Sequence, residues 1–143
     1  MAEEIITHSA EETINWGREF SKRLKAPMLV LLTGDLGSGK TTLTQAICRG
    51  YGVTDDVTSP TFTIVHEYAA AHSKVYHLDL YRMRTPRELE TVGWDDILAD
   101  RALVIVEWPE RAAALMPRGH VPISLSHIDG MPDRRLLYAG GHT

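Results

Sequence analysis

Cysteine is almost absent from this sequence, which has a single thiol at Cys48. One cysteine cannot form a disulfide within the chain, and such usage is typical of a reducing compartment. Long apolar runs are also missing. The longest spans residues 26–32, whereas a membrane helix needs about 20 apolar residues. The acidic start, MAEEIITH, lacks the basic and then apolar order of a signal peptide. We therefore expect a cytoplasmic protein without a membrane partner.

An excess of basic residues is absent too. The 15 lysines and arginines are outnumbered by 19 aspartates and glutamates, which gives a net charge of −4. A protein that holds nucleic acid by itself usually presents a basic face. The charge balance therefore argues against a DNA partner, and it predicts that any RNA is held mainly by a partner protein.

The order of the predicted elements indicates the fold class. A chain of 143 residues is long enough for one hydrophobic core and too short for two, so residues 1–143 are expected to form a single domain. Apolar runs and turn residues predict strands at 3–7, 28–33, 62–68, 74–80, 102–107, 121–128 and 134–138, and helices at 9–24, 40–51, 87–92 and 111–115. This α/β order predicts a three-layer fold whose central, largely parallel sheet is extended by antiparallel strands and hairpins.

The stretch GDLGSGKTT, residues 34–42, carries the strongest signal in the sequence. It contains the pattern G-x-x-x-x-G-K-T between a predicted strand and a predicted helix, as a phosphate-binding P-loop (Walker A) requires. Gly34, Gly37 and Gly39 allow backbone N–H groups to point inward at phosphate oxygens. The pattern therefore predicts a P-loop nucleotide-binding fold.

The same loop predicts individual roles. Lys40 is expected to contact the β and γ phosphates and to be catalytic, and Thr41 is expected to place its hydroxyl on Mg²⁺. The N-terminus of the following helix adds a partial positive charge. The predicted nucleotide-binding residues of the loop are Asp35, Leu36, Gly37, Ser38, Gly39, Lys40, Thr41 and Thr42.

The scarcity of side-chain amides narrows the choice of nucleotide. A guanine site of the small-GTPase type needs an Asn-Lys-x-Asp sequence, but the only asparagine, Asn15, is followed by Trp16. ATP is therefore the expected cofactor, together with Mg²⁺. The only glutamine, Gln45, lies within the predicted P-loop helix, so no glutamine is available in a switch loop to orient the attacking water. Hydrolysis must depend on a carboxylate or a threonine.

Two acids end predicted strands and are the candidate catalytic carboxylates. Glu107 ends the apolar run ALVIV, which is the shape of a Walker B acid, and we predict that it binds the metal. Asp79 ends VYHLD, whose alternation predicts a half-exposed strand. Asp79 is a candidate either to polarise the attacking water or to hold water molecules around the metal. An ion pair between Asp79 and Arg82 is the structural alternative.

Three further features are candidates for nucleotide contacts. Thr61, in the TSPTF loop, is predicted to touch Mg²⁺ or the γ phosphate; a plain turn is the alternative. Trp108 follows Glu107 and is expected within a few ångströms of the nucleotide; a core-filling tryptophan is the alternative. The segment 9–13 is a plausible wall for the adenine.

Four motifs together resemble a known family. GDLGSGKTT, SPTFT, HLDLYR and VEWPE, in this order and spacing, resemble the TsaE family, also called YjeE, of bacterial tRNA threonylcarbamoyladenosine biosynthesis proteins. The resemblance covers nearly the whole chain, from SAEET to the last predicted hairpin. It implies an ATPase that acts with TsaD and TsaB to modify the adenosine next to the anticodon of tRNAs reading ANN codons. In that family the ATPase docks on the TsaB–TsaD heterodimer and supports its turnover without transferring the group itself, so tRNA is an indirect partner.

The resemblance also implies residue roles. Lys40 and Thr41 match the phosphate and Mg²⁺ contacts, Glu107 the second metal contact, Asp79 the acid needed for hydrolysis, and Trp108 the tryptophan beside the site. Two departures stand out. Ser38 replaces the usual alanine, which is harmless in a cradle of backbone N–H groups. Asp133-Arg134 replaces the usual Gly-Arg, which weakens the case for a nucleotide role of Arg134.

Two alternative functions remain open from the sequence. In one, the protein is a binding module in which ATP switches an interaction surface and hydrolysis is incidental. In the other, it is a small-molecule kinase, although only a short segment with Arg84 and Arg87 is available as a phosphate-covering lid. If the ATPase reading holds, hydrolysis by the isolated protein should be slow, because the site lacks both a glutamine and an evident arginine finger until partners complete it.

Overall fold

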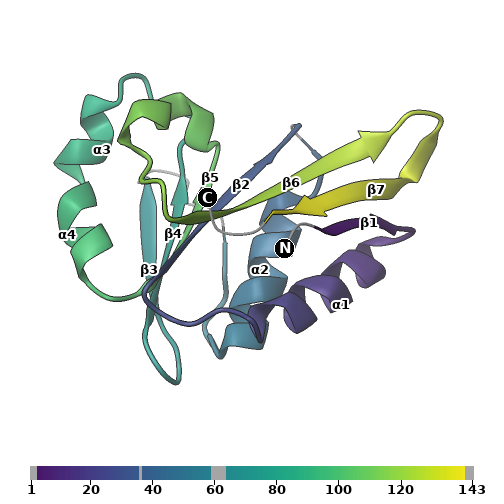
Figure 1. Ribbon diagram of the computed structural model, residues 1–143, viewed down its shortest axis with the longest axis horizontal. Helices are drawn as coiled ribbons and strands as arrows, with labels where there is room; N and C mark the ends of the chain where they lie inside the picture. The colour runs from purple at the N-terminus through teal and green to yellow at the C-terminus, as the bar shows by residue number, and fades with distance from the viewer. Residues whose placement is uncertain (1–2, 36, 59–63, 141–143) are drawn as a thin grey trace.

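Among the residues that the structure describes, seven strands form one sheet (Figure 1). The structure is a computed structural model and describes residues 3–35, 37–58 and 64–140. In chain order the strands are β1 (Glu3–Thr7), β2 (Met28–Gly34), β3 (Val65–Ala69), β4 (Lys74–Asp79), β5 (Leu103–Glu107), β6 (His120–Ile128) and β7 (Met131–Ala139). Across the sheet their order is β1-β7-β6-β2-β5-β4-β3.

The centre of the sheet is parallel and its edges are antiparallel. Strands β6, β2, β5 and β4 run parallel to one another. Antiparallel pairs join β3 to β4, β6 to β7, and β7 to β1. Both predicted hairpins are therefore present. The predicted fold class, a largely parallel central sheet extended by antiparallel strands, is confirmed.

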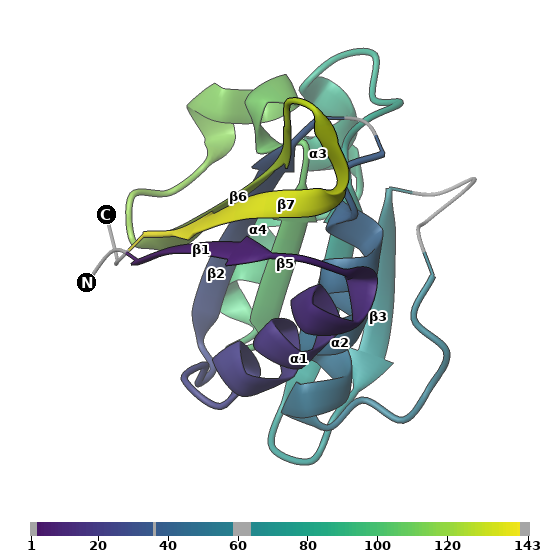
Figure 2. The same ribbon diagram turned by 90° about the vertical axis from the view of Figure 1, so that its right-hand side faces the viewer.

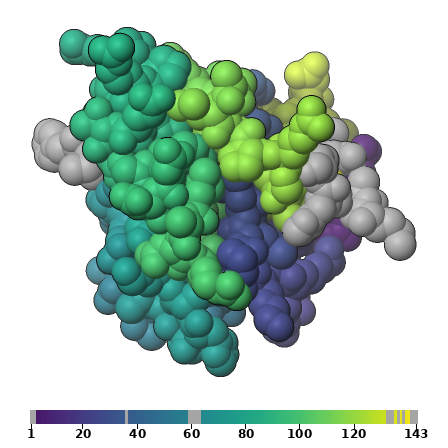
Figure 3. All heavy atoms as spheres, turned by 60° about the vertical axis from the view of Figure 1, so that its left-hand side comes forward, coloured from purple at the N-terminus to yellow at the C-terminus, as the bar shows by residue number. Residues whose placement is uncertain are grey.

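Helices cover the two faces of the sheet. Helices α1 (Ala10–Ser21) and α2 (Lys40–Tyr51) pack side by side on one face (Figure 2). The other face carries α3 (Arg87–Thr91), α4 (Trp94–Ala99) and the 3-10 helix η1 (Pro109–Leu115) (Figure 1). These last segments adjoin on the molecular surface in Figure 3, and the Trp94 indole N–H donates to the Leu115 carbonyl oxygen at 3.0 Å. No described helix is long and apolar enough to span a bilayer.

Two apolar layers separate the sheet from its helices. On one side, Leu43 and Ile47 of α2 pack with Val30 and Leu32 of β2. On the other side, Leu29 and Leu31 of the same strand pack with residues of α4 and η1. Strand β2 is apolar at consecutive positions because side chains alternate between two buried faces.

The structure differs from the sequence prediction in three places. Helix α4 was not expected; it is a single short helix that begins after Gly93, whose φ is +87°. The segment 109–115 is a 3-10 helix rather than an α-helix, with a break at Ala112 where φ is −142°. Strand β4 is buried on both faces and not half exposed, because it lies inside the sheet between β5 and β3.

The topology brings the ends of three parallel strands to one edge of the sheet. Strand β2 leads through the glycine-rich loop into α2. The registers pair Leu32 of β2 with Glu107 of β5, and Glu107 with Asp79 of β4. Both candidate acids therefore lie beside the loop, at the carboxyl edge where open α/β sheets bind their ligands.

Candidate functional site

The loop after β2 has a backbone conformation that requires glycine. Gly37 and Gly39 have φ values of +78° and +101°, in a region that side chains with a Cβ rarely adopt. At Gly34 a Cβ would lie 2.2 Å from the carbonyl oxygen of Leu125 on β6, so no larger residue fits. The glycines thus have the backbone freedom that the sequence pattern requires; a close approach of this loop to phosphate groups stays a prediction.

Lys40 begins α2, and its side chain folds back over the loop. Its Nζ donates to the carbonyl oxygens of Gly34 at 2.5 Å and of Asp35 at 2.8 Å. The same ammonium lies 4.1 Å from the centre of the Trp108 ring. Burial lowers the pKa of Lys40, although the nearby carboxylates of Glu107, Glu110, Asp35 and Asp79 oppose this shift. An ammonium held over the glycine-rich loop can meet an anionic group that enters there; phosphate binding by Lys40 stays a prediction.

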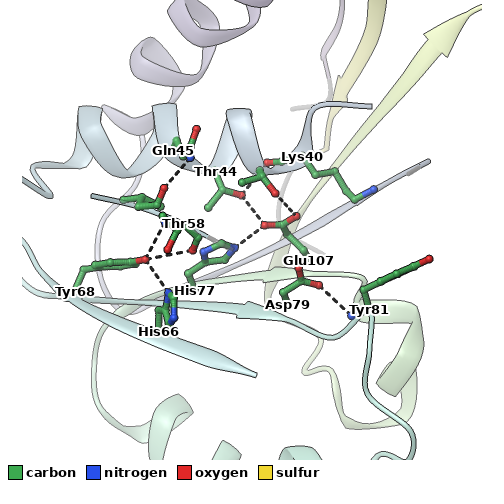
Figure 4. Close-up of polar contacts among 12 residues, drawn as sticks. Lys40, Thr44, Gln45, Thr58, His66, Tyr68, His77, Asp79, Tyr81 and Glu107 are labelled. Carbon is green, nitrogen blue, oxygen red and sulfur yellow. Dashed lines mark hydrogen bonds and ion pairs between the residues drawn. The ribbon is translucent and has the colours of Figure 1, made fainter. Parts of the chain in front are cut away.

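Glu107 ends β5 beneath the first turn of α2 and is only 2% exposed. The Thr41 hydroxyl lies 3.5 Å from its Oε1. The Thr44 hydroxyl lies 3.4 Å from its Oε2 (Figure 4). Hydroxyl and carboxylate oxygens are ligands that Mg²⁺ prefers. The two residues predicted to bind the metal, Thr41 and Glu107, are therefore neighbours whose chemistry fits that ion.

Sequence reasoning missed a third partner of Glu107. The Nε2 atom of His77 lies 2.5 Å from Oε2 of Glu107, and both side chains are buried. His77 stands two residues before Asp79 on β4, so the alternation of strand side chains could have placed both on one face. The missing information was the pairing of β4 with β5, which brings the histidine to the acid.

Asp79 lies at the end of β4, in register with Glu107. Its Oδ1 accepts a hydrogen bond from the backbone N–H of Tyr81 at 3.0 Å. Burial raises the pKa of Asp79, with the neighbouring charge of Glu107 adding to the effect. No ion pair joins Asp79 to Arg82 in the described part of the chain, so the structural alternative for this acid gains no support.

Trp108 directly follows Glu107 and adopts a left-handed backbone with φ of +60°. This conformation ends β5 and turns the indole toward the loop, where it covers Lys40. The ring of Tyr81 lies 4.9 Å from the Trp108 ring, and the Tyr81 side chain is exposed. Trp108 is partly buried: it lines the hollow beside the loop and also packs against the core residues on that side of the sheet.

Two hollows adjoin the loop and share Gly37, Gly39 and Thr42. The hollow of about 430 Å³ is also lined by Lys40, Thr41, Asp79, Tyr81, Glu107 and Trp108. The hollow of about 580 Å³ is also lined by His8, Ser9, Ala10, Thr13, Ser38 and Arg135. The smaller hollow contains Lys40 and both candidate acids. The larger one is bounded by Arg135 and by the N-terminal segment that is the candidate adenine wall.

Arg135 is a second residue that sequence reasoning did not identify. Its Nε donates to the carbonyl oxygen of Ser38 at 3.0 Å, which ties β7 to the glycine-rich loop. This contact joins residues 97 positions apart. The neighbouring Arg134, considered from the sequence, has a side chain outside the described part of the structure.

Two predicted nucleotide contacts, Leu36 and Thr61, lie outside the described residues. Thr58, the first residue of the TSPTF loop, is described. Its backbone N–H donates to the hydroxyl of Tyr68 at 3.3 Å (Figure 4). The single glutamine, Gln45, donates to the carbonyl oxygen of Val57 at 2.7 Å. Its amide therefore holds the start of this loop to α2.

Comparison with known proteins assigns the chain to a family. The family profile described as "Threonylcarbamoyl adenosine biosynthesis protein TsaE" matches residues 7–136. The TsaE protein of Haemophilus influenzae is 36% identical over a 129-residue alignment that covers 87% of this chain and 82% of the relative. That of Synechocystis sp. is 42% identical over a 116-residue alignment that covers 78% of this chain and 73% of the relative.

A solved structure agrees with these matches. The crystal structure of Bacillus subtilis YdiB superposes with a TM-score of 0.84 and 27% identity, covering 100% of this chain and 87% of that one. The superposition extends the likeness from the motifs to the whole fold. The chain belongs to the TsaE family of tRNA threonylcarbamoyladenosine biosynthesis proteins.

Proposed function

We propose that this protein is a Mg²⁺-dependent ATPase of the cytoplasm that supports the N6-threonylcarbamoyl modification of adenosine next to the anticodon in tRNAs reading ANN codons. It acts with TsaD and TsaB and sustains their turnover; it does not transfer the threonylcarbamoyl group itself. Family membership supports the pathway, and the geometry of the loop supports the ATPase activity.

The observation that carries the proposal is the convergence of Lys40, Thr41 and Glu107 at the mouth of the glycine-rich loop. Lys40 supplies an ammonium to the phosphates, and the Thr41 hydroxyl lies 3.5 Å from the Glu107 carboxylate, so the two side chains can hold Mg²⁺ together. When bound, Mg²⁺ supplies positive charge that neutralises the phosphate oxygens. Asp79 lies beside Glu107 on the neighbouring strand and is the acid available to orient or polarise the attacking water.

Several features support ATP as the bound nucleotide and slow ATP hydrolysis by the isolated protein. The chain has no Asn-Lys-x-Asp sequence for guanine. The amide of Gln45 is hydrogen-bonded to Val57 and lies within α2, so it does not serve the water. Among the described residues, no arginine lines the hollow that holds Asp79 and Glu107. A partner that completes this hollow would therefore accelerate hydrolysis.

The decisive experiment measures ATP turnover by the protein alone and with TsaB and TsaD, together with tRNA modification over many cycles. We expect stimulation by the partners and loss of both activities in Lys40→Ala. The control is Lys22→Ala, which changes an exposed lysine paired with Glu19 far from the loop. Absence of stimulation, together with normal tRNA modification by Lys40→Ala, would refute the proposal.

One observation favours a second candidate, a nucleotide-dependent binding module. The ammonium of Lys40 contacts Trp108, which in turn contacts the exposed ring of Tyr81. Phosphate binding to Lys40 can therefore change the surface at Tyr81 without hydrolysis. Asp79→Asn separates the two functions. If hydrolysis is essential, this variant binds ATP but fails to sustain tRNA modification; if binding suffices, modification persists.

A further inference from the structure

His77 occupies an unusual position for a histidine. It stands in the middle of β4, between β5 and β3, and its side chain is 0% exposed. Its Nε2 lies 2.5 Å from Oε2 of Glu107. An ionised carboxylate can only accept hydrogen bonds, so Nε2–H of His77 donates to it.

The other ring nitrogen makes this burial costly. Nδ1 of His77 is buried and has no hydrogen-bond partner among the residues that the structure describes. An apolar side chain of similar size would fill the same space without leaving a polar atom unsatisfied. Packing alone therefore does not account for His77, whereas its contact with Glu107 does.

The two oxygens of Glu107 have different surroundings (Figure 4). Oε2 faces inward, where Nε2 of His77 lies 2.5 Å away. The Thr44 hydroxyl lies 3.4 Å from Oε2 and 3.0 Å from the Lys40 carbonyl oxygen, and its one proton can serve only one of them at a time. Oε1 faces the Thr41 hydroxyl at 3.5 Å. One oxygen is thus anchored in the protein, and the other points toward the residue that shares the predicted metal site.

We propose that His77 is a positioning residue that anchors Oε2 of Glu107 and thereby keeps Oε1 directed at the Mg²⁺ site beside Thr41. The inference rests on the proposed function, because it concerns the same metal site. A glutamate has three rotatable side-chain bonds, and its hydrogen bonds in the protein determine which orientation persists. Carboxylates that bind metals are themselves held by hydrogen bonds, and loss of such a partner typically costs about 10- to 100-fold in metal affinity.

Two substitutions and one control test this role. His77→Leu removes the hydrogen-bond donor and places an apolar side chain in the same buried space. His77→Gln places an amide N–H at a similar distance from the backbone, so it can donate to the same oxygen. The control is Leu78→Val, because Leu78 is also fully buried on β4 but points to the opposite face of the sheet.

The first readout is the binding of a fluorescent ADP analogue at increasing Mg²⁺ and, separately, in EDTA. For His77→Leu we expect the Mg²⁺ concentration at half-maximal effect to rise about 10-fold or more, with binding in EDTA within about twofold of wild type. His77→Gln should recover most of the loss, and Leu78→Val should match wild type. An unchanged Mg²⁺ titration for His77→Leu, or equal weakening in EDTA, would overturn the proposal.

The second readout needs neither metal nor nucleotide. In the NMR spectrum of the unliganded protein, the Nε2 proton of His77 should give an exchange-protected signal in the imidazole region. Glu107→Gln should shift that signal, whereas Leu78→Val should leave it in place. If no such proton is seen in wild type, or if Glu107→Gln leaves it unmoved, the anchoring contact is absent and the proposal fails.

The experiments also separate this inference from the proposed function. If wild-type binding responds to Mg²⁺ but His77→Leu behaves as wild type, only the role of His77 is refuted. If nucleotide binding by the wild type ignores Mg²⁺, the metal site itself is refuted, and with it the positioning role. In that case the NMR signal would report a purely structural hydrogen bond.

Discussion

The ammonium nitrogen of Lys40 lies 4.1 Å from the centre of the Trp108 indole ring. A cation at this distance is attracted to the face of the ring. Lys40, which we propose binds the phosphates, and the indole next to Glu107 are therefore in direct contact. Any ligand that draws Lys40 toward its own charge changes the environment of the indole.

This contact predicts a fluorescence signal for nucleotide binding. ADP should change the tryptophan emission of the wild-type protein, and Trp108→Phe should abolish that change. The chain has three tryptophans, so Trp94→Phe serves as the control: Trp94 is buried between α4 and η1, where its N–H donates to Leu115. A signal that survives Trp108→Phe would mean that the indole does not report on the site.

Removal of the Lys40 ammonium should weaken nucleotide binding. A hydrogen bond to a charged group contributes about 1.5 to 3 kcal/mol, which corresponds to about 10- to 150-fold in Kd. We expect Lys40→Ala to raise the Kd for ADP by this factor in calorimetry. Lys22→Ala, at an exposed lysine, should bind as wild type. Equal affinities for Lys40→Ala and wild type would contradict a phosphate-binding role.

The raised pKa of Asp79 predicts that the free energy of unfolding depends on pH. Because burial raises the pKa of Asp79 above the usual value of about 3.9, the folded protein holds this proton more tightly than the unfolded chain. The contribution of Asp79 to the free energy of unfolding is therefore greatest below about pH 3.9 and is lost as pH rises through the folded pKa. An asparagine mimics the protonated form at every pH and still accepts the Tyr81 N–H.

Thermal denaturation without metal or nucleotide checks this dependence. Asp79→Asn should have a higher Tm than wild type at pH 7, and the difference should shrink as pH falls toward 4. Asp56→Asn is the control, because the Asp56 side chain is 99% exposed and should leave the Tm nearly unchanged. A lower Tm for Asp79→Asn at pH 7 would show that ionised Asp79 stabilises the fold.

The features that the sequence predicts well are those set by neighbouring residues. The glycine spacing at 34–42, the apolar run before it and the helix after it all act within one segment, and the structure has each of them. Glu107 was also expected at the end of a buried strand. These features depend on local backbone sterics and burial, which the order of residues determines directly.

The features that were missed depend on which strands become neighbours. The contact between His77 and Glu107 exists because β4 pairs with β5, and no local pattern specifies that pairing. The burial of β4 on both faces has the same origin. Arg135 reaches Ser38 across 97 positions of the chain, a contact that only the assembled sheet creates.

The glycine-rich loop gives a final prediction, in which two glycines respond differently to the same substitution. At Gly34 a Cβ would lie 2.2 Å from the Leu125 carbonyl oxygen, so β2 and β6 would have to separate. At Gly37 a Cβ would have no described atom within 4 Å apart from its chain neighbours, so the cost comes from the φ of +78°. Left-handed backbone costs a residue with a Cβ about 1 to 2 kcal/mol. Gly34 also has a positive φ, of +154°, and there the forced contact in the packed sheet adds typically about 1 to 3 kcal/mol.

Urea denaturation of the two alanine variants measures this difference. Gly34→Ala should lose clearly more of the free energy of unfolding than Gly37→Ala, because a backbone carbonyl in a sheet cannot move aside as a flexible side chain can. Each Gly→Ala substitution lowers the conformational entropy of the unfolded chain by a similar amount, so this contribution cancels when the two variants are compared. Equal losses would mean that the β2–β6 pairing adapts at Gly34, and that the close approach there is not what requires glycine.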